Sequence, residues 1–79
     1  MIHTGDKLLC THGNGVYQEG HIYTVGRMVS DRHFQLLTGY NDDHWYATFD
    51  DDGIHVRFDA MKTQYSDAWF DKVYDEDMA

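Results

Sequence analysis

The stretch His44–Phe58, HWYATFDDDGIHVRF, decides which fold this sequence predicts. Apolar residues hold every second position across Trp45–Phe49, and the same alternation resumes across Ile54–Phe58. Because successive side chains of a strand point to opposite faces, each half predicts a strand with one apolar face. The intervening segment Asp51–Gly53 is a typical hairpin signal. The stretch therefore predicts two antiparallel strands joined by a tight turn.

The period of two recurs in three segments on the N-terminal side of this hairpin. They cover residues 7–11, 22–25 and 32–37, and loops that carry glycine and asparagine separate them. Such residues tolerate the positive φ angles that connecting loops require. Five short strands at this spacing indicate a small antiparallel barrel or sandwich.

The C-terminal third allows two interpretations. The residues from 67 to 74 suit either a short helix or a turn followed by a strand. We favour one helical turn at 66–70, capped by Ser66 or Asp67, followed by a closing strand at 72–74. The sequence thus predicts an all-β fold of five or six strands with one short helical turn near the C-terminus.

The length of 79 residues predicts a single domain spanning residues 1–79. A chain of this size buries only about 60% of its unfolded surface, so its core is small. Cys10 is the only cysteine, which excludes an intrachain disulfide and suits a reducing compartment. The N-terminus lacks the pattern of a signal peptide, and no apolar run approaches the roughly 20 residues that span a bilayer. We therefore expect a soluble cytoplasmic protein.

The net charge of −8 is unevenly distributed along the chain. Residues 1–41 contain three acidic and three basic side chains, whereas residues 42–79 contain eleven acidic and three basic ones. The second half therefore carries the whole excess. A negative field repels phosphate backbones and attracts basic surfaces, so we expect no direct binding of nucleic acid.

Four short motifs follow one another along the chain: a Gly-Asp-hydrophobic opening, a Gly-x-x-Tyr-x-Val strand, an acidic-Gly hairpin, and an aromatic residue shortly before Val. They are Gly5-Asp6-Lys7-Leu8, Gly20-His21-Ile22-Tyr23-Thr24-Val25, Asp51-Asp52-Gly53 and Trp69-Phe70-Asp71-Lys72-Val73. In this order they resemble a group of small phage-encoded proteins, over nearly the whole chain. The resemblance implies an SH3-like barrel and a location in the host cytoplasm. Because the stretch between Ile54 and Ser66 is longer than the group's pattern, the strand order after residue 54 stays open.

Candidate metal ligands and catalytic residues are present but do not form a recognisable site. Cys10 and His12 could share one strand face, yet no nearby residue completes the set that a zinc site needs. We interpret Cys10 as a small core residue rather than a nucleophile. Consecutive aspartates in turns are usually solvated, whereas an acid–base pair needs two different environments in a cleft. We therefore predict a non-enzymatic protein without cofactor or metal.

The acidic second half has two interpretations. It can be a solvated face that keeps a small protein soluble, or it can imitate nucleic-acid phosphates and occupy a basic groove on a partner. Tyr and Trp residues in excess of what a small core can bury are typical of protein-binding hot spots. The predicted partner-binding residues combine these acidic and aromatic side chains: Asp42, Asp43, Asp50, Asp51, Asp52, Asp59, Tyr65, Asp67, Trp69, Asp71 and Asp75.

The sequence therefore favours a small acidic binding protein of the phage type, which inhibits a basic host protein. Nucleic-acid-handling or defence machinery is the expected class of partner, because its surfaces are basic. The alternative is a generic SH3-like interaction module, or a phage accessory or assembly protein, whose acidic face is only solubilising. The sequence predicts neither a membrane partner nor an oligomeric state.

Overall fold

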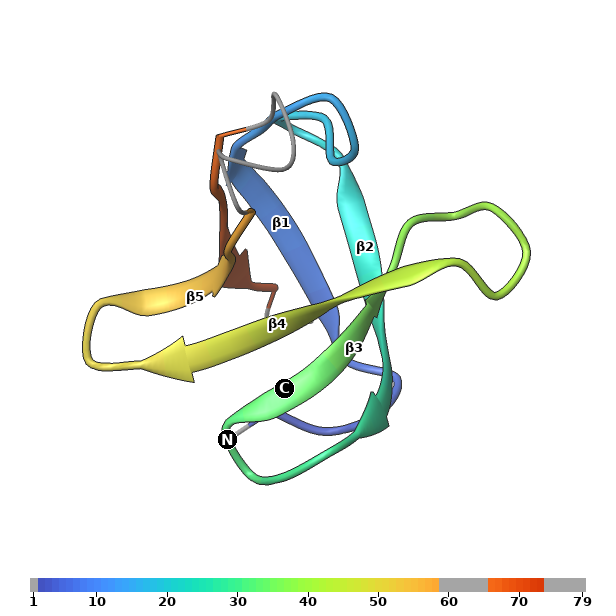
Figure 1. The fold of residues 1–79 in the computed structure, drawn as a ribbon, viewed down its shortest axis with the longest axis vertical. Coiled ribbons are helices and arrows are strands. Elements are labelled where there is room, and N and C mark those ends of the chain that lie inside the picture. Colours follow the sequence, from blue (N-terminus) through green and yellow to red (C-terminus); the bar gives the residue numbers. More distant parts are fainter. Residues whose placement is uncertain (1, 59–65, 74–79) are drawn as a thin grey trace.

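The computed structural model describes residues 2–58 and 66–73, and in these ranges the regular structure consists of strands alone. The strands are β1 (Lys7–His12), β2 (Ile22–Met28), β3 (His33–Leu37), β4 (His44–Asp50), β5 (Gly53–Val56) and β6 (Ala68–Lys72). Each strand pairs antiparallel with the next, and β1 also pairs with β6, so the sheet closes into a barrel (Figure 1). The predicted all-β class is confirmed, and the small barrel fits the SH3-like architecture. The described residues include no helix of the length and apolarity needed to cross a membrane.

The core follows from the alternation along each strand. Inward-facing residues such as Leu8 on β1, Phe34 on β3 and Val56 on β5 are fully buried. One end of the core is aromatic, because the ring of Tyr17 packs edge-on against Tyr23 and Phe70 at centroid distances of 4.9 and 5.2 Å. Such T-shaped pairs contribute about 0.5–1.5 kcal/mol beyond their buried area.

The helical turn predicted at 66–70 is wrong, and so is the alternative helix from residue 67 onward. Strand β6 begins at Ala68 and has the period of two: Ala68 and Phe70 face the core, while Trp69 lies on the outer side. The same strand pairs with β5 on one side and β1 on the other. Two hydrogen-bonded ladders and two buried side chains outweigh a local capping signal, because helix propensity is a weak prior.

The connections alternate between the two ends of the barrel, because every pair of neighbouring strands is antiparallel. The β1–β2 loop (13–21) and the β3–β4 loop (38–43) lie at what we call the loop end, together with residues 57–58 after β5 and residues 66–67 before β6. The N-terminal segment, the β2–β3 turn (29–32) and the β4–β5 turn (51–52) lie at the opposite end, the turn end. Figure 1 shows the β3–β4 loop and the β4–β5 turn at opposite ends of β4.

Candidate protein-binding site

At the turn end, an exposed aromatic side chain lies among carboxylates. Phe49 is 36% exposed, and its N–H donates a hydrogen bond of 2.8 Å to the carbonyl of Arg32, which joins the β2–β3 and β4–β5 turns. A shallow hollow of about 220 Å³ lies between these turns and is lined by Asp31, Arg32, Phe49, Asp50 and Asp51. The register of the meander thus brings Asp31, from the first half of the chain, beside the acidic turn.

A second hollow also has Phe49 in its lining. It measures about 230 Å³, and Gly53, Asp71 and Lys72 are among its lining residues. Asp52 precedes Gly53 in the turn, and its N–H donates to the Asp50 Oδ1 atom at 2.9 Å. We call the residues around these two hollows the acidic turn cluster: Asp31, Phe49, Asp50, Asp51, Asp52 and Asp71.

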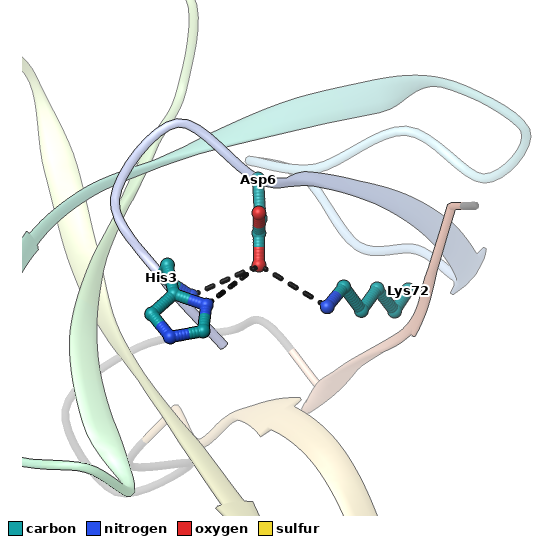
Figure 2. Close-up of polar contacts among 3 residues, drawn as sticks. All are labelled: His3, Asp6 and Lys72. Atoms are coloured by element: carbon teal, nitrogen blue, oxygen red, sulfur yellow. Dashed lines mark hydrogen bonds and ion pairs between the residues drawn. The ribbon is translucent and has the colours of Figure 1, made fainter. Parts of the chain in front are cut away.

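The acidic turn cluster keeps a negative balance because the nearby lysine already faces another carboxylate. The Nζ atom of Lys72 lies 3.5 Å from Asp6 Oδ2, and the N–H of His3 donates to the same oxygen at 2.9 Å (Figure 2). Partial burial acts to raise the pKa of Asp6, but the His3 hydrogen bond and the Lys72 charge together outweigh it, so the pKa lies below its usual value. Asp6 therefore stays ionised beside Lys72 at neutral pH. Asp31, Asp50, Asp51, Asp52 and Asp71 then outnumber the exposed Arg32.

Three predicted acidic residues lie at the loop end instead. Asp42 and Asp43 precede β4, whereas Asp50 ends it, and seven extended residues span about 20 Å. The Asp43 Oδ2 atom accepts a hydrogen bond of 3.1 Å from the Thr38 hydroxyl, which closes the β3–β4 loop. Asp67 accepts the N–H of Phe58 at 3.0 Å and lies 3.8 Å from the Arg57 guanidinium. These carboxylates do not share a surface with the acidic turn cluster, and two of them stabilise their own loops.

Trp69 faces outward, and it packs on the barrel rather than standing free. Its ring lies on the imidazole of His55, its cross-strand neighbour, with centroids 4.8 Å apart. His55 is only 3% exposed, and its Nδ1 atom is buried without a hydrogen-bond partner among the described residues. Trp69 is therefore half-buried, and Phe49 takes the position of the exposed aromatic residue beside the carboxylates. The predicted residues Asp59, Tyr65 and Asp75 lie outside the described residues.

A third hollow, larger than these two, lies at the loop end and has a different character. Its volume is about 560 Å³. One wall consists of the β1–β2 loop and the first part of β2, and the other consists of the end of β3 and the β3–β4 loop. Two of its large apolar lining side chains are exposed, Tyr40 at 78% and Ile22 at 56%. We call this hollow the loop-end groove. Its lining contains no Asp, Glu, Lys or Arg: Gly15, Val16, Gln18, His21, Ile22, Tyr23, Thr24, Leu37, Thr38, Gly39, Tyr40 and Asn41.

Hydrogen bonds hold both walls of this groove in place. On one side, the buried Tyr17 hydroxyl donates to the carbonyl of Leu36 at 2.7 Å, and the Tyr23 hydroxyl accepts the N–H of Gln18 at 2.7 Å. On the other side, the Thr38 N–H donates to the Asp43 carbonyl at 3.0 Å. Gly39 and Asn41 adopt positive φ angles of 96° and 51°, which carry Tyr40 outward on a tight loop. The groove is therefore a preformed feature of the fold.

Cys10 and His12 do not share a strand face, which corrects the prediction. A bulge in the β1–β6 register separates them, so Cys10 is buried in the core while His12 is exposed. Burial raises the pKa of the Cys10 thiol, which therefore stays protonated as a small core side chain. In the part of the chain that the structure describes, no three His, Cys, Asp or Glu side chains gather as metal ligands.

Comparisons with protein-family models, with curated proteins and with solved structures give no match. Sequence reasoning missed Asp31 and Phe49, although a signal for Asp31 exists. Alternate turns of an antiparallel meander lie at the same end, which brings the β2–β3 turn beside the β4–β5 turn. Phe49 continues the inward alternation of β4, so its exposure could not be predicted from the pattern.

Proposed function

We propose that this protein is a small non-enzymatic binding protein that occupies a basic, nucleic-acid-binding surface of another protein. It would act as an inhibitor of the phage type that the sequence resembles. The supporting observation is the acidic turn cluster, in which four carboxylates line the two hollows beside the exposed Phe49 and a fifth, that of Asp52, belongs to the same β4–β5 turn. Carboxylates supply attraction to a basic surface, and an aromatic side chain that becomes buried supplies most of the affinity at a hot spot.

The proposed binding surface contains fewer acidic residues than the sequence predicts. Asp50, Asp51, Asp52 and Asp71 remain, Asp31 and Phe49 are added, and the loop-end carboxylates are left out. Two short turns and the end of β6 hold the remaining charges on a closed barrel. Because these charges lie on short turns of a closed barrel, the part of the entropic cost that comes from ordering the chain on binding is small.

The alternative function is an interaction or assembly module whose acidic residues only solubilise the protein. The observation that favours it is the placement of Asp42 and Asp43 at the far end of β4 from Asp50. Carboxylates at both ends of a small barrel are also what a uniformly solvated surface requires. The two functions differ in whether reversing charges at one end matters more than at the other.

A tagged pull-down from bacterial lysate tests the proposal. We expect the protein to capture a basic nucleic-acid-binding protein near physiological salt. Added duplex DNA should release this protein, and so should about 1 M salt, because screening shortens to about 3 Å there. The double reversal Asp51→Lys/Asp52→Lys should abolish capture, and Phe49→Ala should weaken it by about tenfold or more.

The matched control is Glu19→Lys/Asp42→Lys, which changes the net charge by the same amount at the loop end. All four of these carboxylates belong to exposed residues, so both double variants should fold. Equal loss of capture in the two double variants, with capture by Tyr40→Ala unchanged, would show a nonspecific effect of net charge and contradict the proposal. Capture that neither variant changes would favour the assembly module.

A further inference from the structure

At the loop-end groove, the first part of β2 pairs with β1 along one edge and has no partner strand among the described residues along the other edge, which we call its open side. Its pairing with β1 includes Ile22, whereas its pairing with β3 begins only at Val25. The carbonyl of His21 accepts a hydrogen bond from Cys10 on β1, and the N–H of Val25 donates to Asp6 on the same side. Because backbone groups of an antiparallel strand alternate in direction, the N–H and carbonyl of Ile22 point away from β1.

The chain opposite this open side does not continue as a partner strand. The β3–β4 loop bends away from β2 after Leu37, and the Thr38 N–H is used within that loop (Figure 1). The space left between them is the loop-end groove of about 560 Å³. An extended peptide that pairs with Ile22 would therefore lie between β2 and the β3–β4 loop.

The groove provides side-chain contacts for such a peptide as well as a strand edge. Ile22 and Tyr40 are exposed apolar side chains among its lining residues. In β-strand addition, main-chain hydrogen bonds give affinity and pockets for alternate side chains give specificity. An aliphatic peptide residue placed between Ile22 and Tyr40 would gain burial of about 25 cal/mol per Å² of apolar area.

The charges at the rims select the class of peptide. Glu19 follows Gln18 on one wall and Asp42 follows Asn41 on the other, and both acidic residues are exposed. Lys7 donates to the Thr24 hydroxyl at 2.7 Å from the β1 side, so this cation lies outside the lining. A groove that is uncharged inside and acidic at both walls complements a peptide with an aliphatic centre and basic flanks.

We propose that the loop-end groove binds an extended segment of a partner protein, which adds to β2 at Ile22 and carries Lys or Arg on either side of an aliphatic residue. The inference goes beyond the proposed function, because it concerns the opposite end of the barrel and uses backbone pairing. Both sites can serve one basic partner, but neither requires the other.

A display library of random 12-residue peptides, selected on the immobilised full-length protein, tests the inference. We expect enriched peptides that alternate aliphatic residues with Lys or Arg. Tyr40→Ala should weaken them by about tenfold or more, as truncation of a hot-spot aromatic residue does. Glu19→Lys/Asp42→Lys should weaken them as well, whereas Asp51→Lys/Asp52→Lys should leave them unchanged.

Amide hydrogen exchange supplies a second readout that a merely sticky surface would not give. The Ile22 amide should exchange more slowly when an enriched peptide is bound, because that N–H becomes part of a new ladder. Three outcomes would overturn the inference: no enrichment, peptides that bind Tyr40→Ala as tightly as the wild type, or no change at the Ile22 amide. Enriched peptides without basic residues would overturn the assigned chemistry of the occupant. If only the lysate experiment fails, the groove stands without the acidic turn cluster.

Discussion

The Tyr17 hydroxyl offers the sharpest test of how the barrel holds its loop end. Tyr17 belongs to the β1–β2 loop, is fully buried, and donates to the Leu36 carbonyl at 2.7 Å. Tyr17→Phe keeps the edge-on contacts with Tyr23 and Phe70 but removes the donor. The loss of one buried hydrogen bond should lower the free energy of unfolding by about 1–2 kcal/mol. For a domain of this size that corresponds to a fall in the melting temperature of roughly 4–16 °C.

Urea unfolding followed by tryptophan fluorescence measures this change, with Tyr40→Phe as the matched control because Tyr40 is exposed. Burial raises the pKa of the Tyr17 hydroxyl, so it stays protonated, and the difference between Tyr17→Phe and the wild type should be constant from pH 6 to 9. The reasoning is refuted if Tyr17→Phe unfolds at the same urea concentration as Tyr40→Phe. The loop would then be fixed by other contacts, and the preformed wall of the groove would need another explanation.

Two further predictions concern the half-buried carboxylate of Asp6 and the buried imidazole of His55. The folded pKa of Asp6 lies below the unfolded value of about 3.9, so its contribution to stability is present above that pH and is lost as the pH falls through the folded pKa. In urea unfolding at pH 6 and pH 2, the stability difference between the wild type and Asp6→Asn should therefore shrink at the lower pH; a difference that stays constant would contradict the role of Lys72. His55→Phe should leave thermal stability equal or raise it by about 1 kcal/mol, because it removes an unpartnered buried nitrogen while keeping a ring on Trp69. His55→Ala should instead cost about 2–3 kcal/mol, and equal losses in the two variants would mean that Nδ1 makes a stabilising contact.

The alternation of apolar residues was sufficient to predict most of the sheet. The segments predicted at 7–11, 22–25 and 32–37 lie in or overlap β1, β2 and β3, and the hairpin at 51–53 joins β4 to β5. The pattern succeeds because a side-chain period of two leaves one register in which the buried face is apolar. It fails at residues 66–70, where Trp69 and Phe70 are adjacent and both aromatic. Only the two partner strands decide that Phe70 faces the core and Trp69 covers His55.

The acidic turn cluster was harder to predict, because charge along a sequence does not give charge in space. Asp42 and Asp52 are ten residues apart and lie at opposite ends of β4, whereas Asp31 and Asp51 are twenty residues apart and line one hollow. The order of turns around a closed meander decides these distances. The hairpin motif at 51–53 predicts one turn, but it does not predict which other turn lies beside that turn. The amino-acid composition does not indicate the loop-end groove, because the groove depends on the residue at which β2 begins to pair with β3.

The two surfaces should therefore differ in how they respond to salt. The acidic turn cluster consists of five carboxylates and one aromatic ring, so its attraction to a basic surface depends on charge and its binding should fall steeply with ionic strength. At the loop-end groove the open side at Ile22 adds main-chain hydrogen bonds and apolar contact, which salt screens little. A complex whose affinity falls only partly between 0.15 and 1 M salt would engage both ends. The remaining affinity should then disappear with Tyr40→Ala, because Tyr40 is the most exposed apolar side chain lining that groove.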